Sequence, residues 1–280
     1  AADLVRALDA AAPDGEPTLH LSAAMCGQHR ADVIARIRHR LDVRRAGAAA
    51  ALRVVATQLV EAGVDIDFPV VLRALAGLDA IAQAAGRCNR EGRLGARGGR
   101  VEVFVRPIPA MLAALVRAAQ ATRAVLGDAR PEALRPELFS DYFKHWYAQF
   151  STDEKKVLPM LRASPDFDLR LRSAARAYRL IDDQDQVAVV VPYTPDGGAD
   201  PRHGLALAAL QAGTAERWHL RVLQRSVVQA RQREVLAGLA RGDFSEPVPG
   251  WFVLNDEQRY SRRFGLLAEG AVLDAPSLVQ

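Results

Sequence analysis

The stretch VVATQLVEAGVDIDFPVVLRALAGLDAIAQAAGRCNREGR, residues 54–93, decides the fold of this chain. It begins with a short apolar run at residues 54–56, and a polar turn leads to a second apolar run at residues 69–75. A helical pattern follows over residues 79–88. Strand, loop, strand and helix in this order are typical of a parallel α/β sheet, in which ligands bind beyond the carboxyl ends of the strands.

Polar residues gather at two places in this stretch, after the first strand and at the end of the helix. The first group is Thr57, Gln58, Glu61, Gly63, Asp65 and Asp67, and the second is Gln83, Gly86, Arg87 and Arg90. Both groups lie at a strand's carboxyl end or one turn beyond it. The sequence therefore predicts that they face one cleft.

These two groups resemble the fifth and sixth signature motifs of superfamily 2 helicases, the sixth having the form QxxGRxxR. The sequence TQLVEAGVDIDFP, followed by QAAGRCNREG, most resembles the CRISPR-associated helicase–nuclease of type I systems, which unwinds and degrades invader DNA. A looser similarity to that family's fourth motif covers His20 to Arg30. RLIDD, VVVPY and GWFVL in the second half resemble its C-terminal accessory domain.

Composition places the chain among globular proteins with an anionic partner. Half of its 280 residues are apolar, which is enough to bury a core. The net charge is +4, but residues 28–45 and 83–106 each carry a net +4, almost entirely from arginine, which pairs well with phosphate. A solvated basic face remains the alternative for either run. We expect a polyphosphate or nucleic-acid partner.

The same composition argues against a membrane or metal protein. No apolar run approaches the ~20 residues that span a bilayer. Cys26 and Cys88 lie in different segments, which predicts free thiols in a reducing cytoplasm. The histidines form no helical pair, so the sequence predicts no metal site.

The fold class expected from this pattern and resemblance is α/β. Residues 1–108 would form a second RecA-like lobe with a parallel sheet, incomplete at its N-terminus because the family's first strand is absent. Residues 109–138 would form a linker helix that ends at Gly127, and residues 139–280 a smaller, mostly helical α+β accessory domain. Strands are expected at 18–21, 52–56, 70–74, 101–105 and 187–191, and helices at 28–41, 79–88 and 231–241.

Three further patterns allow two interpretations each. An aromatic stripe on a helix is either core packing or a base-stacking platform; its residues are Tyr142, Phe143, Trp146, Tyr147 and Phe150. Asp182, Asp183 and Asp185 form either an acidic turn or a cation site. The glycine–arginine segment 92–100 is interpreted as a basic turn rather than a P-loop, because it lacks a closing Lys-Ser or Lys-Thr pair.

The resemblance implies roles for individual residues. Arg87 and Arg90 would be arginine fingers that stabilise the transferred phosphoryl group, three residues apart on one helical face. Residues for ATP binding would be Gly63, Asp65 and Gln83, and residues for DNA phosphates would be Ser22, Thr57 and Gln58. Asp65 would contact the nucleotide sugar or couple to the arginines. Asp67 would hold the loop through backbone hydrogen bonds.

The cofactors implied are ATP and Mg²⁺, bound mainly through a first RecA-like lobe that these residues do not contain. No GxxxxGK[ST], DExH or histidine–aspartate nuclease motif occurs in the sequence, so the chain alone should neither hydrolyse ATP nor cut DNA. The partners implied are single-stranded DNA, the first lobe, the nuclease domain and the RNA-guided surveillance complex.

Two other functions remain open. Another superfamily 2 helicase of repair or restriction would share Gly86, Arg87 and Arg90, although such enzymes usually lack the EAGVDIDFP wording. A non-catalytic module would instead use the basic segments to hold DNA or to dock on the surveillance complex.

Overall fold

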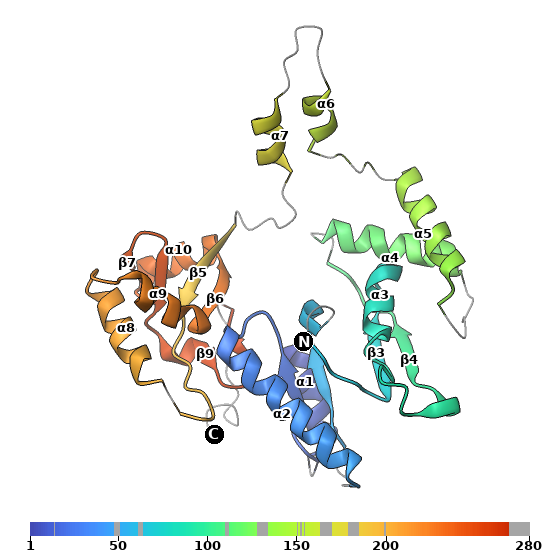
Figure 1. Cartoon of the computed structure of the whole chain (residues 1–280), viewed down its shortest axis with the longest axis horizontal. Coiled ribbons are helices and arrows are strands. Elements are labelled where there is room, and N and C mark those ends of the chain that lie inside the picture. Colours follow the sequence, from blue (N-terminus) through green and yellow to red (C-terminus); the bar gives the residue numbers. More distant parts are fainter. Residues whose placement is uncertain are drawn as a thin grey trace. The chain divides into compact units, whose positions relative to one another are not determined.

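The chain forms two compact units, which are described separately below (Figure 1). Unit 1 combines residues 1–64 with residues 183–280, and unit 2 comprises residues 65–182. The computed structural model describes all residues except 14, 48–50, 61–63, 110–111, 128–133, 150, 152, 154, 163–169, 179–184, 199 and 269–280. This division cuts the chain at other places than the predicted domains 1–108, 109–138 and 139–280, which stay a prediction.

The first segment of unit 1 is a small α/β layer. Its elements are α1 (Ala2–Ala10), β1 (Leu19–Leu21), α2 (Gly27–Arg45), β2 (Val54–Ala56) and the 3₁₀ turn η1 (Gln58–Val60). The strands β1 and β2 are parallel, with Leu21 opposite Ala56. Helix α2 buries four side chains at helical spacing, His29, Val33, Ile37 and Leu41, so one face meets the core and its arginines point outward.

The second segment of unit 1 is a four-stranded mixed sheet in the order β6-β5-β8-β7. The strands are β5 (Gln186–Val190), β6 (Val227–Arg231), β7 (Phe244–Val248) and β8 (Trp251–Leu254). The helices are α8 (Pro201–Gln211), α9 (Arg217–Leu223) and α10 (Gln232–Arg241), with the 3₁₀ turns η3 (Gln224–Ser226) and η4 (Glu257–Arg259). The short strands β9 (Tyr260–Ser261) and β10 (Gly265–Leu266) form an antiparallel pair.

This sheet has a buried core on each face. Val189 and Phe252 pack with Val235 of α10 on one face, whereas Val190 packs with Leu210 of α8 and Leu223 of α9 on the other. The alternation follows from the period of two in a strand. Strand β5 was predicted at residues 187–191 and helix α10 at residues 231–241, and both are confirmed within one residue.

Residues near both ends of the chain meet inside unit 1. Arg263 forms an ion pair with Asp9, and the amide of Leu266 donates to the carbonyl of Ala24 at 2.7 Å. Cys26, which is fully buried, belongs to the same core as the sheet residues of β5 and β8. The N-terminal α/β layer is therefore held by the segment that contains β9 and β10.

Unit 2 is a two-stranded parallel ribbon with helices. Its elements are β3 (Val70–Ala74), α3 (Leu78–Ala85), the turn η2 (Gly95–Arg97), β4 (Arg100–Phe104), α4 (Ala113–Leu126), α5 (Pro136–Gln149), α6 (Val157–Leu161) and α7 (Leu171–Ala177). Its core contains Leu78, Ala121 and Tyr142, from α3, α4 and α5. Thr122 anchors α4 by donating from its hydroxyl to the carbonyl of Ala76 at 2.8 Å.

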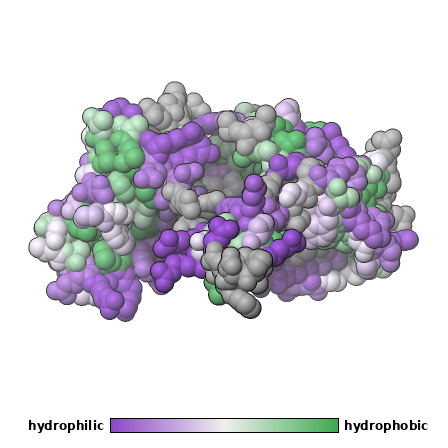
Figure 2. All heavy atoms as spheres, turned by 90° about the horizontal axis from the view of Figure 1, so that it is seen from above, coloured by the Kyte–Doolittle hydropathy of each residue, from purple (hydrophilic) through white to green (hydrophobic). Residues whose placement is uncertain are grey.

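The mixed α/β class is confirmed, but the single RecA-like sheet is not. In the part of the chain that the structure describes, β1–β2 and β3–β4 are separate two-stranded sheets. A two-stranded ribbon cannot bury both faces, and Leu72 is 62% exposed. The molecular surface drawn in Figure 2 is mostly hydrophilic with smaller hydrophobic areas. No helix among the described residues is long and apolar enough to span a bilayer.

Two details of the predicted elements need correction. The helix predicted at residues 79–88 begins at Leu78, with Gly77 as its N-cap. The aromatic stripe is split, because Tyr142 is buried in the core whereas Tyr147 is 63% exposed. Phe150, Asp182 and Asp183 lie outside the described residues.

Candidate functional site

In unit 2, the end of the first predicted motif group is joined to the second group by backbone pairing. The amide of Phe68 donates to the carbonyl of Arg87 at 2.9 Å, and the amide of Asn89 donates to the carbonyl of Phe68 at 2.9 Å. Phe68 and Cys88 thereby form an isolated parallel bridge just before β3. This pairing brings the carboxylates at 65 and 67 next to the arginines at 87 and 90.

Arg90 is held at two points by these carboxylates. Its Nη1 lies 2.7 Å from Oδ1 of Asp65, and its backbone amide donates to Oδ1 of Asp67 at 2.8 Å. The side chains of Arg90 and Asp65 are 43% and 72% exposed. An exposed ion pair of this kind contributes about 0–1 kcal/mol. The guanidinium is therefore oriented, yet it can exchange Asp65 for another anion at little cost.

The backbone around the arginines departs from the predicted helix. Helix α3 ends at Ala85 instead of Cys88, because the following residues pair with Phe68. Asn89 then adopts a left-handed conformation with φ of 47°. Arg87 and Arg90 are therefore not on one helical face, which corrects that expectation.

Asn89 and Cys88 stabilise the turn that carries Arg90. Asn89 tolerates the left-handed region better than most residues, and its Oδ1 accepts from the amide of Leu94 at 3.0 Å. Sγ of Cys88 donates toward the carbonyl oxygen of Arg100 at 3.4 Å. Burial raises the pKa of this thiol. Gly99 leaves room for the sulfur, since a Cβ there would lie 2.5 Å from it.

The segment that follows is the basic turn that the sequence predicts. Residues 92–100 connect α3 to β4 through the short 3₁₀ turn at Gly95–Arg97, and their glycines at 92, 95 and 98 have positive φ. Arg93 is paired with Glu91 and Arg100 with Glu102. The structure thus uses the segment as a compact connection.

In unit 1 the predicted DNA contacts follow two neighbouring parallel strands. The amide of Thr57 donates to the carbonyl of Leu21 at 3.0 Å, which places Thr57 beside Ser22. Thr57 and Gln58 are exposed, as phosphate contact requires. Ser22 is buried, and its Oγ has no hydrogen-bond partner in the described part of the chain.

For the remaining predicted site residues, the structure gives only their exposure and the unit to which they belong. Gln83 is exposed on the last turn of α3, and Gly63 lies outside the described residues. Asp65, Gln83, Arg87 and Arg90 belong to unit 2, whereas Ser22, Thr57 and Gln58 belong to unit 1. The roles of all these residues remain predictions.

A buried polar cluster in unit 1 was missed by sequence reasoning. His29 is fully buried and stacks on Tyr193 with ring centroids 4.4 Å apart. Its Nδ1 lies 2.9 Å from the hydroxyl of Tyr260, which also accepts from the amide of Cys26 at 3.0 Å. The direction of the contact between His29 and Tyr260 depends on the tautomer of the ring, and we assign the ring proton to Nε2, so that the Tyr260 hydroxyl donates to Nδ1.

Burial lowers the pKa of His29 to about 4, so the ring is neutral at physiological pH. The Tyr193 hydroxyl donates to Asp32 at 2.8 Å and extends the cluster along α2. No local pattern indicates this cluster, because the two tyrosines lie more than 160 residues along the chain from their partners Asp32 and His29.

Comparison with known proteins connects these motifs to one family. Residues 1–93 match the family model described as "CRISPR-associated nuclease/helicase Cas3, C-terminal". A 50-residue stretch is 52% identical to the CRISPR-associated nuclease/helicase Cas3 of Haloferax volcanii, and covers 18% of this chain and 5% of that protein.

Solved structures show the same fold over most of the chain. T. fusca Cas3 covers 90% of this chain at 18% identity with a TM-score of 0.56, and its AMPPNP form does so at 17% identity with a TM-score of 0.57. This chain covers about a third (34%) of the length of each. A CRISPR RNA-guided surveillance complex in a pre-nicking state matches at 16% identity with a TM-score of 0.50. The predicted resemblance to the C-terminal part of the CRISPR-associated helicase–nucleases is confirmed.

Proposed function

We propose, from this resemblance to the C-terminal part of Cas3, that the chain supplies the second half of an ATP-dependent superfamily 2 DNA helicase of type I CRISPR defence. In this proposal unit 2 contributes arginines to a nucleotide, and the N-terminal layer of unit 1 contributes part of the track for single-stranded DNA. The observation that carries it is the double anchoring of Arg90 by Asp65 and Asp67.

The anchoring suits an arginine that must be positioned before its phosphate arrives. Asp67 fixes the backbone of Arg90, so the side chain starts from a defined place. Asp65 orients the guanidinium through an exposed ion pair that is weak enough to be exchanged. A planar guanidinium then binds phosphate oxygens in a bidentate manner. We infer that Asp65 acts by positioning Arg90 rather than by binding the sugar.

The exposed guanidinium of Arg90 fits a nucleotide phosphate. Bound ATP would provide the phosphoryl group whose charge grows in the transition state, and an arginine finger is worth about 10³–10⁵ in rate. Arg90 would meet that charge, with Arg87 half-buried beside it. The described residues include no cluster of three potential ligands for Mg²⁺, and we propose that Mg²⁺ is held by a partner lobe. T. fusca Cas3 has been solved with ATP, ADP and AMPPNP.

Single-stranded DNA would lie along the strand ends of unit 1. The exposed hydroxyl of Thr57 and amide of Gln58 are suited to phosphate contacts, which position a strand without reading its sequence. Ser22 would contribute only if its buried hydroxyl became accessible. We propose docking on an RNA-guided surveillance complex by analogy with the solved complex that the chain resembles.

The test is the ATP turnover of the chain combined with a first RecA-like lobe. Arg90→Ala should lower kcat by about 10²-fold or more with a smaller change in nucleotide affinity, since the charge acts mainly in the transition state. Asp65→Asn should lower kcat less, because it removes the positioning contact but leaves the guanidinium of Arg90 in place. Arg93→Ala is the matched control, since Arg93 is exposed on the same turn and paired with Glu91.

Thr57→Ala distinguishes the effect of DNA contacts on turnover from the effect of the ATP site. It should weaken DNA binding and DNA-stimulated turnover while basal hydrolysis stays close to that of the parent. If Arg90→Ala retains turnover within a few-fold of the parent, the arginine finger lies elsewhere and the proposed mechanism is wrong.

A further inference from the structure

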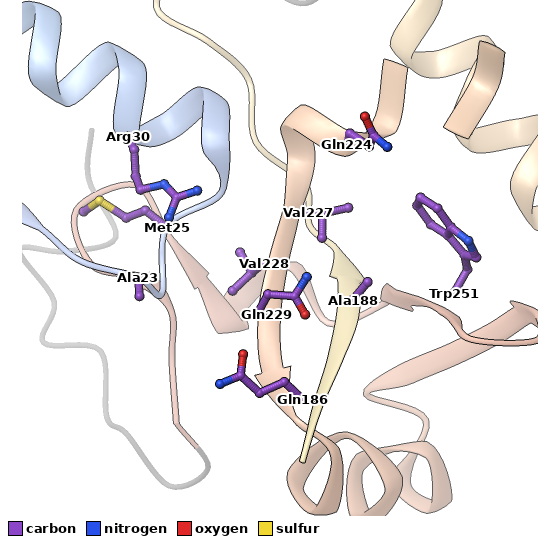
Figure 3. Close-up of a pocket in the computed structure, with 10 residues that line it drawn as sticks. All are labelled: Ala23, Met25, Arg30, Gln186, Ala188, Gln224, Val227, Val228, Gln229 and Trp251. Carbon is purple, nitrogen blue, oxygen red and sulfur yellow. The ribbon is translucent and has the colours of Figure 1, made fainter. Parts of the chain in front are cut away.

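A pocket of about 580 Å³ lies in unit 1 between the loop after β1 and one face of the four-stranded sheet (Figure 3). Its volume is within the range of small-molecule sites. Ten residues line it: Ala23, Met25, Arg30, Gln186, Ala188, Gln224, Val227, Val228, Gln229 and Trp251.

The pocket exists because helices cover only part of this sheet face. The side chains of Val190, Val227 and Val253 lie beneath α8 and α9. Two residues away along each strand, the same face carries a row of three side chains, because the register places Ala188 of β5 between Gln229 of β6 and Trp251 of β8. The small side chain of Ala188 leaves a hollow between the amide and the indole.

The polar groups of the pocket have no partners inside the protein. The side-chain amides of Gln186, Gln224 and Gln229 make no hydrogen bond in the part of the chain that the structure describes, and all three residues are exposed. Arg30 likewise has no carboxylate partner among the described residues, whereas Arg36 and Arg40 on the same helix are each paired with a carboxylate. Figure 3 shows Arg30 and Trp251 on opposite sides of the pocket with the glutamines between them.

This set of groups matches one chemical class of ligand. An indole offers a stacking surface for a flat ring, and a glutamine amide offers a donor and an acceptor to a base edge. The single charged group that lines the pocket is a guanidinium, which favours an anion. A base stacked on an aromatic side chain must be unpaired.

We propose that this pocket binds one unpaired nucleotide of single-stranded DNA, with the base against Trp251 and the glutamines and its phosphate near Arg30. The pocket adjoins the predicted DNA track, because Ala23 follows Ser22 directly and Met25 lies two residues further along. The inference rests on the proposed function for the identity of the strand, and it extends the DNA contacts from the motif residues to the C-terminal sheet.

The experiment measures binding of the full 280-residue chain to two fluorescein-labelled probes without ATP. One probe is a 12-nucleotide oligothymidylate, and the other is an abasic oligonucleotide of equal length and charge. Trp251→Ala should weaken binding of the thymidylate by about tenfold and leave the abasic probe nearly unchanged, because stacking requires a base. Trp251→Phe should recover most of the loss.

Arg30→Gln should weaken binding of both probes, because both carry phosphates. It should also lower the slope of log affinity against log salt concentration by about one, the value expected for one lost phosphate contact. Gln229→Ala should weaken only the thymidylate, by a few-fold. Gln229 is exposed and its side chain makes no hydrogen bond to any described residue, so this variant tests the pocket even if Trp251→Ala unfolds. Trp218→Ala is the control, since Trp218 is 44% exposed and lies outside the lining residues.

A thymidylate that carries 4-thiothymidine should crosslink to peptides containing Met25 or Trp251. Crosslinks confined to other peptides, equal losses on both probes in Trp251→Ala, or unchanged binding in Gln229→Ala and Arg30→Gln would each overturn the proposal. The outcome is independent of the ATPase test. Suppose that Arg90→Ala keeps its turnover while Trp251→Ala and Gln229→Ala weaken binding of the thymidylate but not of the abasic probe. The arginine-finger mechanism would then be wrong, and the proposed nucleotide pocket would be supported.

Discussion

The buried histidines predict a steep loss of stability in mild acid. His29 and His20 are both buried, and burial lowers the pKa of each to about 4 from the ordinary value of 6.5. In the unfolded chain both rings take up a proton below pH 6.5, whereas in the folded chain they stay neutral down to about pH 4. The unfolded state therefore binds more protons in this window, and stability falls as the pH decreases from 6.5 to 4.

The size of the effect follows from the same pKa values. Each unit of pKa shift corresponds to about 1.4 kcal/mol, so each histidine costs about 3 kcal/mol once the window is crossed. Between pH 7 and pH 5 the expected loss is about 2 kcal/mol per histidine. That is a large share of the ~5–15 kcal/mol by which a domain is stable.

Urea unfolding at pH 7, 6 and 5, followed by near-ultraviolet circular dichroism, measures this slope, because Tyr193 and Tyr260 pack against His29. His29→Asn places an amide oxygen near the position of Nδ1 and removes one titrating ring, so about half of the slope should vanish. His39→Asn, on the exposed face of the same helix, is the matched control. A slope that is equal in His29→Asn and in the parent would refute the reasoning.

The other predictions concern single contacts. Tyr260→Phe leaves the amide of Cys26 without its acceptor and should lower the free energy of unfolding by about 2–3 kcal/mol in a urea titration; no measurable loss would contradict the contact. Gly99→Ala forces a Cβ against Cys88 and should raise amide exchange in the turn before β4, and unchanged exchange would show that the turn adapts. Gly204→Ala lies inside α8 with open space around it, so it should raise the free energy of unfolding by about 0.5–1 kcal/mol and with it the melting temperature. A lower melting temperature would contradict this reasoning.

Local sequence patterns predicted the elements well and their assembly poorly. The strands 70–74 and 100–104 and the helix on residues 27–45 follow directly from apolar periodicity. The division into two units does not, because it depends on contacts between distant residues such as Arg263 and Asp9. No local pattern records which distant segment will cover an apolar face.

The candidate site shows the same limit. The spacing of the two motif groups pointed to Asp65, Asp67 and Arg90, and the structure brings these three together. The left-handed Asn89 went unnoticed, since nothing in the sequence marks which asparagine will adopt that conformation. The pocket near Trp251 was also missed, because its row of side chains comes from three strands whose register a single sequence does not reveal.

The interleaving of the two units sets an order of events during protein synthesis. The layer that carries Thr57 leaves the ribosome early, yet its contacts with Tyr260, Arg263 and Leu266 need residues made about 200 positions later. Unit 2, which is formed by the continuous segment 65–182, is free to fold in between. The layer that carries Thr57 therefore keeps its apolar face exposed until those residues have been made. Bringing segments so far apart in sequence together is slow. Chain growth past residue 266 becomes the step that commits unit 1 to its native state.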